Sequence, residues 1–485
     1  MTPPPKKQLS NQTLKGSVVV AGTQMTSAIL GLAITAALAR MVRPEDFGLI
    51  AKTAAITGVV GLFGDFGLSL ATIQSKEISS KELSTFFWLN VGIGLALGLL
   101  TACLSPLISL FYDDPRAGIA SIVMGFNILI AAYCVQHNAI LTRRLAFGQI
   151  GIANVGALVI GGLAAIAFAS AGFQFEALLL QLTVTVIAKA FILSVYSKFV
   201  PTLTLEIRES VPNLKMSGSF TASNTVNYAA RNADNILIAR VWGEEVLGYY
   251  AKSYSLLLLP LTKINGPLTQ VVIPVLSKLQ DSPAQFRSFF RKGYAIAMLL
   301  QIPLCVFIVF TGEEIVLCML GSQWTESIPI FNALAPCLLA SATAPATSWT
   351  VLPMGQTGRY FKIVFANSVV MVTGFALSVS SGVVAMAWTF SVLACLLRIP
   401  TILFAIKPTP VQIRDIIDGM KMPILLSAFA SLPLGWLAYR GTTWSPLTSL
   451  MIQAALFFGI YGFLSQWTEP WIDLKHRITT KLKSA

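Results

Sequence analysis

Charged residues are scarce in this sequence of 485 residues: they make up 11% of it, whereas 55% of its residues are hydrophobic. A soluble globular protein carries charges at about 25% of its positions. A chain of this length with so few charges cannot cover its surface with groups that water solvates, so a soluble domain is excluded. We therefore expect most of the surface to face lipid.

Residues that carry much of enzyme chemistry are also scarce. The chain has two histidines, and its six cysteines lie in or beside apolar runs without the spacing of a metal site. It has no Walker-type phosphate loop and no Ser/His/Asp arrangement. No loop between the apolar runs exceeds about twenty residues. We expect no enzyme, no metal and no cofactor, and a function that takes place within the membrane.

Apolar runs long enough to cross a bilayer as helices, at roughly 20 residues each, recur along the whole chain. The first run, 16–39, is too long for the core of a cleaved signal peptide, so we expect it to be retained. The predicted fold is all-α, a polytopic membrane protein of about fourteen transmembrane helices. The predicted spans are 16–39, 47–73, 86–112, 117–141, 148–171, 174–197, 215–239, 246–273, 289–311, 325–353, 358–380, 382–406, 420–439 and 445–467.

Lysine and arginine are unevenly distributed over the loops. With the N-terminus inside, 23 of the 34 basic residues fall in cytoplasmic segments and 5 fall outside, as the positive-inside rule requires. The net charge of +13 then reflects contact with anionic lipid, and no nucleic acid partner is expected. The sequence predicts a multi-pass protein of the bacterial inner membrane with both termini cytoplasmic. Acidic pairs gather in the outer loops: Glu45-Asp46, Asp113-Asp114, Glu244-Glu245 and Glu313-Glu314.

Part of the sequence repeats after a shift of 200 positions. Residues 39–52 and 239–252 are identical at six of fourteen positions without a gap, and each segment follows an apolar run. Six spans separate the two copies, so two pseudo-symmetric six-helix lobes would run in the same direction, as parallel repeats of transporters do. The predicted parts are a cytoplasmic N-terminus 1–15, an N-lobe 16–197, a cytoplasmic linker 198–214, a C-lobe 215–406, two further helices within 420–467 and a cytoplasmic tail 468–485.

Polar side chains inside the spans predict a wet central cavity, because a charge in hydrocarbon costs about 3 kcal/mol or more. In the span 215–239 they recur every three or four residues and form one helix face. Two alternatives stay open: hydrogen bonds between helices, with an internal Arg231–Asp234 pair, and lysines that reach the outer interface. The candidate substrate-binding residues are Gln24, Lys52, Asn224, Asn227, Tyr228, Arg231, Asn235, Lys252 and Lys263, and the candidates for ion coupling or gating are Asp65 and Asp234.

Four segments carry a resemblance to a known family: Asp65–Gln74, Leu247–Tyr254, Pro260–Gln280 and Leu320–Trp324. They resemble the polysaccharide-exporter branch of the MOP superfamily, similar to Wzx-type flippases and to colanic-acid and teichuronic-acid exporters. The resemblance implies two six-helix lobes in a V. It also implies a flippase that moves an undecaprenyl-diphosphate-linked oligosaccharide across the inner membrane by alternating access, for lipopolysaccharide or exopolysaccharide biosynthesis.

The resemblance implies partners as well. These are the lipid-linked oligosaccharide, membrane lipids, a proton or sodium gradient, and a polysaccharide polymerase with its chain-length proteins. Cavity cations would hold the diphosphate, since arginine and lysine bind phosphate well. Two alternatives stay open: an ion-coupled multidrug antiporter of the same fold, for which Asp65 is the candidate acid, and a lipid scramblase without a driven cycle.

Overall fold

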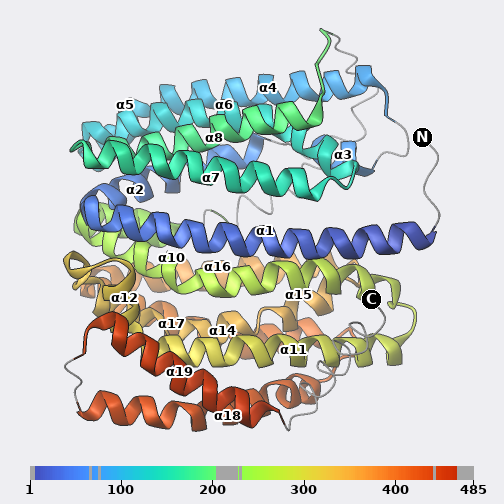
Figure 1. Ribbon diagram of the computed structural model, residues 1–485, viewed down its shortest axis with the longest axis vertical. Coiled ribbons are helices and arrows are strands. Elements are labelled where there is room, and N and C mark those ends of the chain that lie inside the picture. The colour runs from blue at the N-terminus through green and yellow to red at the C-terminus, as the bar shows by residue number, and fades with distance from the viewer. Residues whose placement is uncertain are drawn as a thin grey trace. The chain divides into compact units, whose positions relative to one another are not determined.

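The computed structural model is built of helices, and it has no strand in the residues it describes, 6–64, 68–74, 78–203, 228, 232–440 and 444–466. Twelve of the described helices are long and apolar enough to cross a membrane, or thirteen if one bent pair counts as a span. The predicted all-α membrane fold is confirmed (Figure 1). The count of fourteen stays a prediction, because the span 215–239 lies largely outside the described residues.

Residue contacts divide the chain into two compact units, Met1–Ala251 and Lys252–Ala485. The first unit holds α1 (Lys6–Met41), α2 (Pro44–Gly61), η1 (Leu62–Gly64), α3 (Leu68–Gln74), α4 (Ser80–Cys103), α5 (Ser105–Tyr112), α6 (Pro115–Arg143), α7 (Phe147–Ser170), α8 (Phe175–Ser197) and the beginning of α10 (Ala233–Lys278). Proline starts α2 and α6, where its missing N–H is not needed.

Glycine sets the packing inside the first unit. Gly98 on α4 and Gly125 on α6 lie so close that a Cβ on either would come within 2.7 Å of the other's carbonyl oxygen. A Cβ on Gly162 of α7 would meet Ile34 of α1, and one on Gly161 would meet Thr185 of α8. Such close contacts hold membrane helices together where lipid removes the hydrophobic driving force.

The second unit holds the rest of α10 and the helices that follow it. Phe286, Phe290, Tyr294 and Trp349 are fully buried in one of its core clusters. The helices are α11 (Pro283–Phe310), α12 (Gly312–Met319), η3 (Ser322–Trp324), α13 (Ser327–Leu334), α14 (Cys337–Ala342), α15 (Pro345–Val351), α16 (Thr357–Ser378), η4 (Val379–Ser381), α17 (Val383–Ile406), α18 (Ile413–Arg440) and α19 (Pro446–Ser465).

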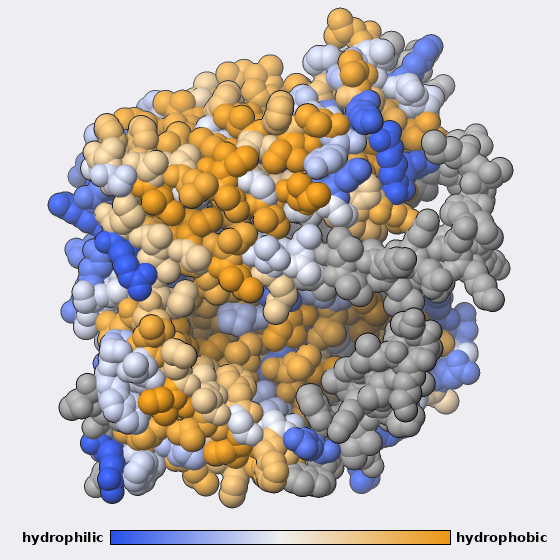
Figure 2. Space-filling view, viewed as in Figure 1, coloured by the Kyte–Doolittle hydropathy of each residue, from blue (hydrophilic) through white to orange (hydrophobic). Residues whose placement is uncertain are grey.

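The outward faces of the long helices are apolar. In the first unit Leu163 on α7 and Phe191 on α8 are 62% and 70% exposed, and in the second Leu377 on α16 is 76% exposed. Figure 2 shows mainly apolar side chains over α7 and α8, with hydrophilic side chains toward the helix ends. This distribution suits helices whose middle faces hydrocarbon and whose ends face water.

Helix α10 is broken at Gly243. Its 46 residues would span roughly 70 Å as one helix, about twice a bilayer. Gly243 has φ 82° and ψ 179°, a conformation that glycine adopts without steric cost. The repeat pairs this position with Arg43, the extended residue between α1 and α2. The turn predicted between 215–239 and 246–273 therefore has its counterpart in the turn between α1 and α2.

The predicted span 325–353 is also interrupted. It consists of α13, α14 and α15, with a bend of 44° between Ser327–Leu334 and Cys337–Val351. The hydroxyl of Ser391 on α17 donates to the carbonyls of Ala333 and Leu334 at 2.6 and 3.1 Å. A helix broken within a membrane is tolerated where neighbouring side chains satisfy the freed carbonyls. Helix α17 supplies that support here.

Candidate functional site

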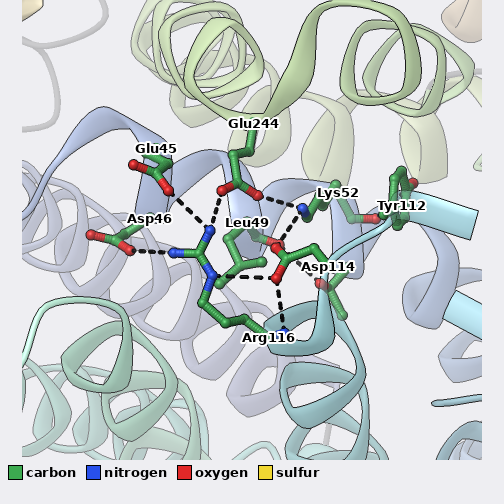
Figure 3. Close-up of polar contacts among 9 residues, drawn as sticks. Glu45, Asp46, Leu49, Lys52, Tyr112, Asp114, Arg116 and Glu244 are labelled. Carbon is green, nitrogen blue, oxygen red and sulfur yellow. Dashed lines mark hydrogen bonds and ion pairs between the residues drawn. The ribbon is translucent and has the colours of Figure 1, made fainter. Parts of the chain in front are cut away.

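Six charged side chains of the first unit gather where α2 and α6 begin (Figure 3). The cluster has two cations and four acids, so the acids exceed the cations. The side chains come from the first turns of α2, from the turn between α5 and α6, from the first turn of α6, and from α10 directly after its break. We call this set the charge cluster: Glu45, Asp46, Lys52, Asp114, Arg116 and Glu244.

Lys52 is the inner cation of the charge cluster, with a side chain that is 4% exposed. Its ammonium donates to Asp114 Oδ2 at 2.8 Å and to a carboxylate oxygen of Glu244. The ring of Tyr112 lies 5.4 Å away. A buried ammonium is stabilised only when partners of this kind surround it. In this conformation two carboxylates hold Lys52, and the side chain does not extend to water.

Arg116 is the outer cation, with a side chain that is 39% exposed. Its guanidinium contacts all four acids: Glu45 at 2.9 Å, Asp114 at 3.3 Å, Asp46 at 3.9 Å, and Glu244. The flat guanidinium presents five N–H donors, so one arginine can bind several carboxylates at once. Arg116 and Lys52 both bind Asp114 and Glu244, which makes the cluster a single network.

Asp114, in the turn between α5 and α6, binds both cations of the charge cluster. One carboxylate oxygen binds Lys52, and the other accepts the backbone N–H of Arg116 at 2.9 Å and so caps α6. Burial raises the pKa of Asp114, but the hydrogen bonds from Lys52 and from the Arg116 backbone outweigh it, and the pKa falls from 3.8 to about 2. Asp114 therefore stays ionised at neutral pH.

The two copies of the sequence repeat touch each other beside the charge cluster. A Cβ on Gly48 would lie 1.7 Å from the carbonyl oxygen of Glu244, and a Cβ on Gly248 would lie 1.9 Å from that of Pro44. The shift of 200 positions pairs Gly48 with Gly248 and Pro44 with Glu244. The contact is therefore reciprocal, as a local pseudo-twofold axis requires. Only glycine permits this approach of α2 to α10.

Three other predicted site residues lie in the first unit near α10 and α2. The Tyr228 hydroxyl donates to the Ala54 carbonyl at 3.0 Å, which is a hydrogen bond between helices. The carboxylate of Asp234 accepts the Tyr250 hydroxyl at 2.9 Å. The Asn235 amide donates to the side chain of Asn232 at 3.2 Å.

The structure describes three more of the predicted residues. Gln24 lies on α1, and Lys252 and Lys263 lie on α10 within the second unit, all three partly exposed. Asp65, Asn224, Asn227 and Arg231 lie outside the described residues. The predicted roles of these residues in substrate binding and coupling stay predictions.

Sequence reasoning identified Lys52 but missed its partners. It placed Asp114, Arg116 and Glu244 in outer loops, where charged residues are expected to be solvated. Two features of the sequence could have predicted these partners. Acidic pairs gather in the predicted outer loops, and Lys52 lies within the first two turns of the span that follows one of them. An excess of acids facing a buried cation is a pattern that predicts pairing.

Comparisons with known proteins agree with the fold and with one another. A family model described as "Polysaccharide biosynthesis protein" matches residues 37–329. The chain is 26% identical over 328 residues to the lipopolysaccharide biosynthesis protein WzxC of Escherichia coli (strain K12), which covers 67% of each chain. It is 25% identical over 395 residues to the teichuronic acid biosynthesis protein TuaB of Bacillus subtilis (strain 168), which covers 80% of each.

A solved structure of the lipid II flippase MurJ, in an inward closed conformation, has the same fold. It superposes with a TM-score of 0.73 at 16% sequence identity, and the match covers 93% of this chain and 98% of that one. At this identity the likeness shows the fold alone.

Proposed function

The chain belongs to the polysaccharide biosynthesis protein family and has the fold of the MOP superfamily, and on this premise we propose that it is a flippase for a lipid-linked oligosaccharide. The proposed substrate is an undecaprenyl-diphosphate-linked oligosaccharide, moved from the inner to the outer leaflet of the inner membrane. WzxC and TuaB are named for lipopolysaccharide and teichuronic acid biosynthesis, and these names support a surface polysaccharide as the product. The family match, which includes both copies of the repeat, carries the proposal.

The charge cluster supports alternating access as the mechanism. A transporter built of two repeats needs a contact between them that forms in one state and breaks in the other. The first copy contributes Lys52 and Gly48, and the second contributes Glu244 and Gly248. The distribution of lysine and arginine predicts that these segments lie at the outer side of the membrane. We assign the charge cluster and the two glycines as the outer gate, closed in this structure.

Opening of this gate changes the partners of Lys52. When α10 moves away from α2, Lys52 loses Glu244, and one of its two carboxylate contacts has to be replaced. A phosphate oxygen of the substrate can replace it, since lysine binds phosphate as a point charge. The predicted role of Lys52 in substrate binding then belongs to the open state.

A deletion strain tests the proposed substrate. Its lipids are extracted and analysed by mass spectrometry for an undecaprenyl-diphosphate oligosaccharide. We expect this lipid to accumulate in the deletion strain and to disappear when the intact gene is restored, but not when Lys52→Ala is supplied at equal membrane level. Normal surface polysaccharide with no accumulated lipid would overturn the assignment and favour the antiporter or scramblase alternative.

A further inference from the structure

Arg398 is an arginine inside a membrane-spanning helix of the second unit. It lies eight residues before the end of α17, roughly 12 Å from that end at 1.5 Å per residue. Its Nε donates to the hydroxyl of Thr343 at 2.6 Å, whereas its Nη2 is buried and has no hydrogen-bond partner in the part of the chain that the structure describes. The guanidinium thus keeps a donor and its charge available.

Other arginines of this unit are satisfied by the chain itself. Arg287 binds the carboxylate of Asp415 at 2.7 and 3.0 Å. Arg359 donates twice to the carbonyl of Phe404, at 3.0 and 2.7 Å, and lies over its ring. Arg398 differs from both, because its one hydrogen bond among the described residues goes to a neutral hydroxyl.

Two buried hydroxyls near Arg398 also have no hydrogen-bond partner among the described residues. Thr347, 5% exposed, stands on α15 four residues after Thr343, and α15 packs against α17. Tyr294 of α11 is fully buried, and its hydroxyl interacts electrostatically with Arg398. A buried donor left unsatisfied costs about 1–3 kcal/mol, so unpaired polar groups are rare. Unpaired polar groups on three neighbouring helices, α11, α15 and α17, indicate that one ligand binds all of them.

Support for the broken helix explains only part of this arrangement. Ser391 covers the break after α13, and Arg398 reaches Thr343 at the break between α14 and α15. A neutral side chain such as glutamine could make the bond to Thr343. Helix support therefore accounts for the Nε contact of Arg398 but not for its positive charge, its buried Nη2 or the free hydroxyl of Thr347.

We propose that Arg398, Thr347 and Tyr294 form a binding site for the phosphate group of a lipid. A phosphate oxygen can accept from the arginine Nη2 and from both hydroxyls. The neighbours of Arg398 on α17 suit a lipid tail, since Leu396, Ile399 and Leu403 are apolar and 62%, 65% and 48% exposed. The phosphate belongs either to a bilayer phospholipid or to the isoprenyl diphosphate of the cargo, and the second source rests on the proposed function.

Native mass spectrometry of the full-length protein in detergent tests the site. The probes are phosphatidylglycerol, undecaprenyl diphosphate and, as a phosphate-free lipid, diacylglycerol. Arg398→Gln should weaken binding of a phosphate lipid about tenfold or more, and Thr347→Val about threefold, because one charged and one neutral hydrogen bond are lost. Binding of diacylglycerol should not change. Lys407→Gln removes one exposed cation after the same helix and should match the unmodified protein.

Thermal unfolding of the empty protein separates binding from support of the fold. Thr347→Val replaces an unpaired hydroxyl by a methyl group of similar shape, so its Tm should be unchanged or higher while its lipid affinity falls. This variant keeps the proposal testable if Arg398→Gln does not fold. The proposed site would be overturned if Thr347→Val and Tyr294→Phe bound each of the two phosphate lipids as tightly as the unmodified protein does.

The two phosphate lipids distinguish the source of the ligand. If Arg398→Gln weakens binding of undecaprenyl diphosphate more than binding of phosphatidylglycerol, the site is assigned to the cargo. If it weakens binding of phosphatidylglycerol more, the site is assigned to a bilayer lipid. Both results support a phosphate site. Binding is measured without transport, so failure of the export experiment would not affect this result, and failure here would leave the outer gate untouched.

Discussion

Lys52 in the first unit and Arg398 in the second are both cations within membrane helices, but the chain treats them differently. Lys52 binds two carboxylates, and its side chain is 4% exposed. Arg398 binds one neutral hydroxyl and keeps a buried Nη2 without a partner among the described residues. A membrane cation needs a counter-charge in either case. For Lys52 the chain itself supplies the counter-charge, and this contact forms the proposed gate. For Arg398 the counter-charge has to come from a ligand.

The same contrast appears in how neighbouring helices meet. At the outer gate, Gly48 and Gly248 bring two backbones together with no side chain between them. In the core of the second unit, Phe290, Tyr294 and Trp349 interlock as large buried rings. A glycine contact with ion pairs around it can separate without exposing much apolar surface, while separation of an aromatic core would expose a great deal. Movement is therefore expected at the first contact.

The largest expected effect comes from reversing the charge of Lys52. Lys52→Glu would leave five acids around Arg116, and we expect export to fall at least about a hundredfold, since loss of one partner of a buried ion pair costs about 3–5 kcal/mol. The double variant Lys52→Glu/Glu244→Lys restores opposite charges and should recover a tenth or more of the export. Surface polysaccharide per cell, with membrane protein measured by immunoblot, gives the result. A double variant as inactive as the single one would remove the gate assignment.

A methyl group at the glycine contact should have the next largest effect. Gly48→Ala would place a carbon 1.7 Å from the Glu244 carbonyl oxygen, so α2 and α10 cannot close fully. We expect export to fall about tenfold, in line with about 1–3 kcal/mol for overpacking. Gly92→Ala on α4 is the matched control, because among the described residues no atom outside its own stretch of helix lies within 4 Å of its new Cβ. Equal export by both variants would mean that closure does not use this contact.

The four acids of the charge cluster should differ in importance. Asp114 binds both cations and caps α6, whereas Asp46 has one ion pair among the described residues, to Arg116 at 3.9 Å. Asp114→Asn should therefore lower export about fivefold, and Asp46→Asn less than about twofold. The same surface polysaccharide assay, run on both variants side by side, gives the ratio. A larger loss for Asp46→Asn would contradict the network as described.

The pKa of Asp114 also limits how the gate responds to pH. A lowered pKa means that its contribution to stability is complete above the ordinary value of 3.8 and is lost only as pH falls toward about 2. Near neutral pH Asp114 does not titrate. The pH profile of export by Asp114→Asn should therefore parallel that of the unmodified protein there, at a lower level. A profile that loses its pH dependence would identify Asp114 as a proton site.

The fold could be predicted from the sequence because lipid imposes one rule on every span. Apolar runs of sufficient length must be helices, so most predicted spans match helices, and the repeat located the turn that Gly243 makes. The double break in 325–353 was not predicted, because a broken and a continuous apolar helix have similar composition.

The candidate site could be predicted only in part. The repeat and the cost of a buried charge singled out Lys52, but they do not say which loop reaches it. Its partners Asp114 and Glu244 lie 62 and 192 residues away along the chain, and helix packing alone brings them together. Arg398 shows the same limit, since its position within an apolar run does not say which side chain it contacts, and in the structure it donates to Thr343.

The smallest expected effect concerns the support that α17 gives to the broken helix. Ser391→Ala removes the hydroxyl that donates to the carbonyls of Ala333 and Leu334, and should destabilise the protein by about 1 kcal/mol. Ser378→Ala is the control, because the hydrogen bonds of the Ser378 hydroxyl in the described part of the chain stay within its own helix, to the carbonyls of Gly374 and Phe375. Thermal unfolding in detergent should show a lower Tm for Ser391→Ala than for Ser378→Ala. Equal Tm values would mean that these carbonyls need no donor from α17.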